Sequence, residues 1–216
     1  MSTYSIYVTN NSWKVQTYYV FCALPEVSGA SSTSNPYSNV FAAGRPVNND
    51  GSVQQFTITD DSFAIHSNVS MSLDGDSNIE VAPITVLNGG PMFGTCTAGS
   101  PAGSFEITVG AYDAVQYPDV WCGFGKTSAG DSDADTTPGV SVAACWQADP
   151  KATFIVTPHV NFYIATGDFT KGQVVNVTEI GAKVEIDFTG RHDRYAVVTH
   201  GTDGNFTVQL QPNPPS

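Results

Sequence analysis

The chain has 216 residues, a formal net charge of −12 and only 13% charged residues. An acidic chain repels nucleic-acid phosphates and anionic lipids, so we expect neither as a partner. It contains no run of about 18 apolar residues, so no segment is expected to span a membrane. The first residues lack the basic and apolar regions of a secretory signal, and we therefore expect a cytoplasmic protein.

Short apolar runs predict β-strands along the first half of the chain. The run at 15–23 is apolar on both faces, which is typical of a central, covered strand. The segment 26–38 has the composition of a surface loop, and 88–103 is crowded with Gly, Ser and Pro, which indicates a boundary between two layers. The predicted strands of this half are 3–9, 15–23, 40–43, 52–59, 62–73 and 80–87.

In the second half, strands are predicted at 104–109 and 140–147, and a solvated acidic loop at 127–139. Segment 111–126 is apolar and aromatic but poorly periodic, so we expect an irregular segment or a short strand packed against the core. Four runs rich in Val, Ile, Phe and Thr then predict consecutive antiparallel strands in a meander. They are 153–157, 161–166, 173–179 and 183–188, and a last pair follows at 194–200 and 205–211.

No stretch of ten residues has the period of a helix, and the predicted strands are closely spaced. This pattern favours an all-β fold with two stacked antiparallel sheets, sandwich-like, formed by a single domain over 1–216. Large β domains have edge strands to cover, so a homodimer through an edge strand is also expected.

Catalytic and metal motifs are missing from the sequence. There is no nucleophile elbow, P-loop or dinucleotide fingerprint, and the four histidines lack zinc-site spacing. Asp74, Asp76 and Asn78 match the start of a calcium loop, but the rest of that motif is absent, which favours a turn. We therefore expect no enzyme activity and no metal.

The four cysteines are Cys22, Cys96, Cys122 and Cys145. Their spacings match no zinc motif and no redox pair. In a reducing compartment they are expected to be small buried hydrophobes, while a disulfide or a covalently modified cysteine remains the alternative.

Aromatic residues are the most informative feature that remains. The chain has 12 Phe, 9 Tyr and 3 Trp, and several of them gather in the less regular stretches around Trp121 and Trp146. They form either core packing or an apolar pocket for a flat ligand. Trp13, after an Asn-Asn turn, is instead a candidate platform on which a sugar would stack.

One stretch resembles the RhiA-like family of rhizosphere-expressed bacterial proteins and their relatives in mushroom-forming fungi. The matching residues are Phe154, Thr157-Pro158-His159, Phe162-Tyr163-Ile164, Gly167-Asp168-Phe169, Lys171-Gly172, Val174-Val175, Val177 and 184–188. The family has no assigned reaction, so the resemblance implies no catalytic residues. Its fungal branch includes a fruiting-body protein that holds an indolone-type pigment, which implies that the aromatic cluster surrounds a chromophore.

These observations predict a non-catalytic small-molecule binding protein, with an organic aromatic pigment held in an apolar pocket. The alternative is a lectin-like carbohydrate-binding β-sandwich. The candidate ligand-binding residues are Trp121, Trp146, Tyr163, His159 and Cys122.

Overall fold

The computed structural model describes residues 2–29, 36–67, 93–98, 104–116, 120–130 and 139–215. Within these ranges the chain is all-β, and the one helical element is a single 3₁₀ turn at Val177–Glu179. The all-β prediction is therefore confirmed. The expected strand at 80–87 and the turn at 74–78 lie outside the described residues. In the part of the chain that is described, no helix is long and apolar enough to cross a membrane.

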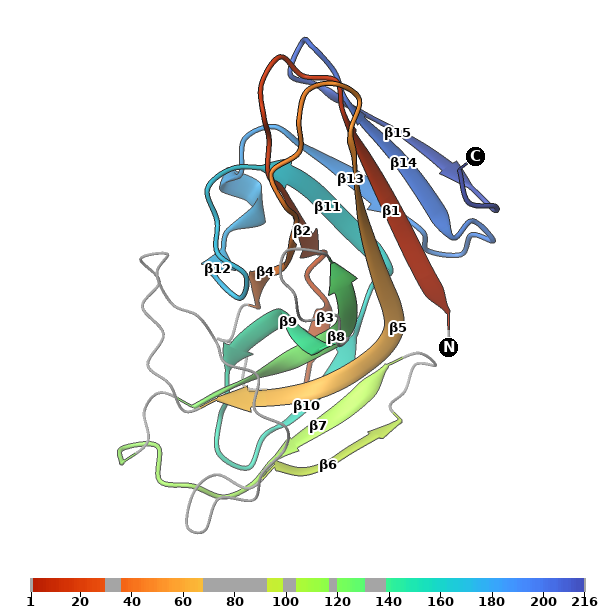
Figure 1. The fold of residues 1–216 in the computed structure, drawn as a ribbon. Helices are drawn as coiled ribbons and strands as arrows, with labels where there is room; N and C mark the ends of the chain where they lie inside the picture. The colour runs from red at the N-terminus through yellow and green to blue at the C-terminus, as the bar shows by residue number, and fades with distance from the viewer. Residues whose placement is uncertain are drawn as a thin grey trace.

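Eleven strands form one large sheet. They are β1 (Thr3–Asn10), β2 (Tyr18–Cys22), β4 (Tyr37–Ala43), β5 (Val53–Ser67), β8 (Trp121–Gly130), β9 (Gly139–Gln147), β11 (Asn161–Thr166), β12 (Val174–Val175), β13 (Lys183–Asp187), β14 (Tyr195–His200) and β15 (Phe206–Gln211). Their order is β13-β11-β2-β4-β9-β8-β5-β1-β14-β15, with β12 paired to β4. The end strands β13 and β15 come into contact, so the sheet curls into a nearly closed, barrel-like form (Figure 1).

Four strands form a second, smaller sheet in the order β3-β10-β7-β6. Their bounds are β3 (Glu26–Ser28), β6 (Phe93–Ala98), β7 (Phe105–Val109) and β10 (Thr153–Thr157). This sheet lies against the part of the large sheet that contains β8 and β9 (Figure 1). Phe154 of β10 packs on Trp146, and Phe105 of β7 packs on Phe124, with ring centroids 5.8 and 6.3 Å apart.

The predicted sandwich of two stacked antiparallel sheets is therefore replaced by two unequal sheets that stack only at one end of the molecule. The large sheet is also not purely antiparallel, because β1 pairs with β14 in parallel. Both sheets nevertheless share one core, since buried side chains of β7 and β10 belong to the same cluster as those of β1, β2 and β8. The two-layer packing is a local feature of a larger curved sheet.

The predicted four-strand meander over 153–188 is wrong in its pairing. β10 belongs to the small sheet, and β11 pairs with β2 and β13. The third expected strand is reduced to β12 and the 3₁₀ turn. Asn176 ends the strand because its side chain accepts a hydrogen bond from the Thr178 backbone N–H at 3.2 Å, which caps the turn.

The segment 111–126, for which an irregular segment or a short strand is predicted, contains the start of the ten-residue strand β8. Its glycines hide the strand pattern, because glycine has low β propensity. Gly123 is required by close packing, since a Cβ at this position would lie 2.1 Å from the carbonyl oxygen of Ala144. The predicted strands 52–59 and 62–73 are joined as far as Ser67 in one strand, β5, whose register shifts between Ile58 and Ser62, and 68–73 lie outside the described residues.

Candidate functional site

The two faces of the β8–β9 pair separate the candidate residues. The register places Cys122 opposite Trp146 and Gly123 opposite Cys145. Because successive side chains of a strand point to opposite faces, Cys122 and Trp146 share one face and Cys145 lies on the other. The hydrophobic clusters agree, since Cys122 and Trp146 belong to the main core and Cys145 to a separate cluster.

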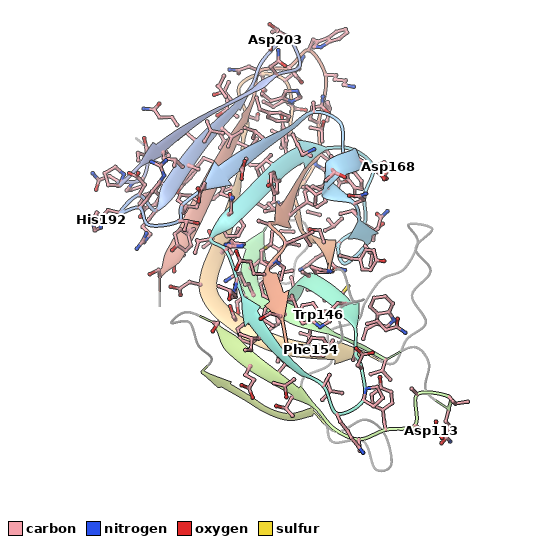
Figure 2. All side chains as sticks on the ribbon, turned by 180° about the vertical axis from the view of Figure 1, so that it is seen from behind. Asp113, Trp146, Phe154, Asp168, His192 and Asp203 are labelled. Atoms are coloured by element: carbon pink, nitrogen blue, oxygen red, sulfur yellow. The ribbon has the colours of Figure 1, made fainter. Side chains whose placement is uncertain are left out.

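The inner face of β8 and β9 is closed. Trp146 is 0% exposed and lies with Phe154 between the two sheets (Figure 2). Cys122 is also buried, and burial raises the pKa of its thiol well above the ordinary value. Two of the predicted ligand-binding residues thus lie in the core.

The outer face carries an aromatic patch that we call the Trp121 face. The pairing register aligns Ile65, Gly123, Cys145 and Tyr37 in one row across β5, β8, β9 and β4. Gly123 contributes no side chain to this row. The Trp121 ring lies beside it, 6.1 Å from the Tyr37 ring at an interplanar angle of 61°. The result is two aromatic rings next to a row in which the Ala144 carbonyl oxygen takes the place of a side chain at Gly123.

Among the residues that the structure describes, two buried polar atoms around this face have no hydrogen-bond partner. They are the indole Nε1 of Trp121, which is a donor, and Oδ1 of Asn39, which is an acceptor. Asn39 is fixed by its other amide atom, since Nδ2 donates to the Gly172 carbonyl at 3.0 Å. Buried polar groups in proteins are nearly always paired, so each orphan requires an explanation. A ligand that supplies the missing partners is one such explanation.

The three cysteines whose side chains the structure describes offer no nucleophile to this face. Burial raises the pKa of the Cys145 thiol to about 12, although the nearby Asn39 side chain counteracts part of the shift. Burial also raises the pKa of Cys22 to about 12. Because the thiolate is the reactive form, these thiols are inert near neutral pH. Cys22, Cys122 and Cys145 are all free, so no disulfide forms among them.

Tyr163 and His159 lie away from the Trp121 face. Tyr163 packs against a third cluster that contains Tyr19 and Phe21, and its hydroxyl donates to Glu185 at 3.4 Å. Burial, followed by the charge of Glu185, raises the Tyr163 pKa. His159 is half-buried in the connection between β10 and β11, where it interacts electrostatically with Asp187.

Of the five predicted residues, only Trp121 therefore lies on the candidate face. Sequence reasoning missed Tyr37, Asn39 and Cys145. The composition of 26–38 predicts a loop that includes Tyr37, but Tyr37 begins β4. No sequence signal connects Tyr37 with Trp121. Tyr37 is in β4 and Trp121 in β8, and the two strands are brought together only because both pair with β9. Among the described residues, no group of three or more His, Cys, Asp or Glu side chains is placed to hold a metal ion.

Comparison with known proteins gives one match. No curated protein and no solved structure matches the chain. The RhiA family model matches residues 1–211, which is nearly the whole sequence and extends well beyond the stretch that first showed the resemblance. The chain belongs to the RhiA family.

Proposed function

We propose that this RhiA-family protein is a non-catalytic binder of a small, flat aromatic molecule, and that the Trp121 face is where the molecule lies. One observation carries the proposal: among the described residues, the Trp121 indole N–H is buried without a partner, on a ring that lies next to Tyr37 and beside Gly123. Binding sites for small molecules are mostly apolar and aromatic, with a few polar groups that orient the ligand.

Burial of apolar surface would supply most of the affinity. Removing roughly 250 Å² of ligand surface from water contributes about 6 kcal/mol before the costs of binding are subtracted. Side chains of Ile65, Val142 and Val174 in the same cluster provide the apolar surroundings. The protonated thiol of Cys145 adds to this apolar character and would not attack the ligand.

An indolone-type pigment fits the polar atoms of the site. A lactam carries a carbonyl acceptor and an N–H donor. These are the two kinds of partner that Trp121 Nε1 and Asn39 Oδ1 lack. Supplying either partner would remove the cost of a buried, unpaired polar group, which is about 1–3 kcal/mol.

The first test is a visible absorbance spectrum of the protein purified from its natural source, with intact mass before and after denaturation. A band beyond the range of Trp and Tyr absorbance, lost together with a released small molecule, is expected for a non-covalent pigment. A mass excess that survives denaturation would instead show covalent attachment. A colourless protein with the plain mass of the sequence would refute the pigment.

The second test locates the site with oxindole, the simplest indolone, as the probe in calorimetric titration. Trp121→Phe keeps an aromatic ring but removes the N–H, and we expect affinity to fall about tenfold, in line with roughly 1.4 kcal/mol for a lost hydrogen bond. Trp13→Phe is the matched control, because Trp13 lies on an exposed loop, and it should bind as the parent does. Equal affinity of the Trp121→Phe variant and the parent would remove the site from this face.

A further inference from the structure

A second site lies at the end of the molecule where β1, β5 and β14 meet their connecting loops. The β4–β5 connection lines an open pocket of about 400 Å³. Its lining is mainly polar and includes Arg45, Asn48, Ser52 and Gln55. In Figure 1 this connection and the β1–β2 connection lie together at the end of the molecule opposite β6 and β7.

Three exposed apolar side chains lie on the two chain segments that meet at this end. Trp13 is 76% exposed, Val15 55% and Val53 54%, and they are three of the five large apolar side chains exposed among the residues that the structure describes. Val53 lines the pocket itself. Single exposed apolar residues need no explanation, but three of them on neighbouring segments at one end of the molecule suggest a binding surface.

The loop that carries Trp13 is held rigidly against the pocket. Val47, which lines the pocket, exchanges backbone hydrogen bonds with Gln16 at 2.8 and 3.1 Å. The Asn10 side chain, which is 0% exposed, donates to the carbonyl oxygens of Val47 at 2.8 Å and Lys14 at 3.1 Å. Its Oδ1 accepts from the Ser12 hydroxyl at 2.7 Å.

Trp13 stands between the two anchored residues Ser12 and Lys14, so its exposure is a fixed feature of the fold. The β14–β15 connection, which contains Asp203, also holds the Trp13 loop (Figure 2). The Asn11 backbone N–H donates a hydrogen bond to the carbonyl oxygen of His200, just before this connection, at 2.9 Å. Ordering such a loop before binding lowers the entropic cost of holding a ligand.

The chemistry of this end selects a ligand with one apolar face and many hydroxyl groups. An indole ring offers a large flat apolar surface, and the amides of Asn48 and Gln55 provide both donors and acceptors. A purely apolar molecule would leave these polar groups unpaired, and the net charge of −12 disfavours an anion. We infer that the Trp13 loop and the 45–55 pocket together bind a neutral saccharide, with one sugar ring stacked on Trp13 and its hydroxyl groups in the pocket.

The test is binding of the full chain to an array of neutral glucan, mannan, galactan and chitin oligosaccharides, followed by titration with the strongest binder. Binding to at least one of them is expected. Trp13→Ala should weaken it about tenfold or more, because a stacked ring contributes at least roughly 1.4 kcal/mol. Asn48→Ala and Gln55→Ala should each weaken it several-fold.

Val115→Ala is the control, since Val115 is 92% exposed and belongs neither to this pocket nor to the Trp13 loop. It should bind as the parent does. No binding to any neutral oligosaccharide, binding to acidic sugars alone, or unchanged affinity of the Trp13→Ala variant would each overturn the inference. The Trp121→Phe variant should retain full saccharide affinity, because Trp121 is not part of this site. The aromatic-ligand proposal and the saccharide inference can therefore fail independently of each other.

Discussion

The two faces of the β8–β9 pair are built from the same twenty or so residues but have opposite properties. On the inner face, Cys122, Phe124 and Trp146 are buried between the two sheets. On the outer face, Trp121 is only half-buried and Gly123 provides no side chain, although each face has one tryptophan N–H that is buried without a partner among the described residues. Ile65, Val142 and Cys145 on the outer face are also buried, so the two faces differ mainly in the partial exposure of Trp121.

This difference shows that aromatic density in a sequence does not locate a site. Trp121 and Cys122 are adjacent in the chain, yet they point to opposite faces. Only the pairing of β8 with β5 and β9 decides which face is covered. The comparison predicts that substitutions on the inner face will mainly change stability, and that those on the outer face will mainly change binding.

The largest effect is expected for Trp146→Ala. Trp146 is fully buried against Phe154, so truncation removes packing from both sheets and leaves a cavity. The free energy of unfolding should fall by about 3–5 kcal/mol, as measured by urea denaturation. Trp13→Ala is the control and should change the free energy by less than about 0.5 kcal/mol, because Trp13 is exposed. A loss below about 1 kcal/mol for Trp146→Ala would contradict a closed inner face.

Local sequence pattern predicted much of the fold, because alternation of apolar residues survives wherever one face of a strand is buried. The bounds of β10 and β11 agree with the prediction at both ends, and β1 differs by one residue. The pairing could not be predicted, since β1 meets β14 and β2 meets β11 across more than a hundred residues. The curl of the large sheet follows from these distant pairings and not from any local signal.

The candidate site was less predictable for the same reason. The sequence indicates Trp121 and Trp13 as candidates because both stand outside a regular alternating pattern. The sequence does not indicate Asn39 or Cys145. The unpaired Oδ1 of Asn39 comes to lie near Cys145 only because β4 pairs with β9. Tyr163 lies on the outer side of another part of the sheet, which its strand pattern alone did not specify.

An intermediate effect is expected at alkaline pH from the buried thiols. Burial raises the pKa of Cys145 from 9.0 to about 12, so the folded state binds this proton more tightly than the unfolded state. The resulting stability is intact below about pH 9.0 and is lost as the pH rises toward about 12. The slope is at most about 1.4 kcal/mol per pH unit for each thiol.

Cys145→Ala should therefore flatten the pH dependence of the unfolding free energy above pH 9.0, and Cys22→Ala should do the same, because its thiol has a similarly raised pKa. The two substitutions lie in separate clusters, so their effects should add. Urea denaturation across the alkaline range measures both. Profiles that run parallel to that of the parent would show that these thiols titrate equally in the folded and unfolded states.

The smallest effect on the free energy of unfolding is expected for Trp121→Phe. Trp146→Phe makes the same chemical change on the other face and serves as the comparison. Both tryptophans have an indole N–H that is buried and unpaired, so phenylalanine removes a cost of about 1–3 kcal/mol in each case. At Trp146 the closed core cannot relax, and the cavity should make the variant less stable overall. At the half-buried Trp121 less packing is lost, so the unfolding free energy should stay within about 1 kcal/mol of the parent value. Equal and large losses in both variants would mean that the Trp121 face is as tightly packed as the core, which would leave no room for a ligand there.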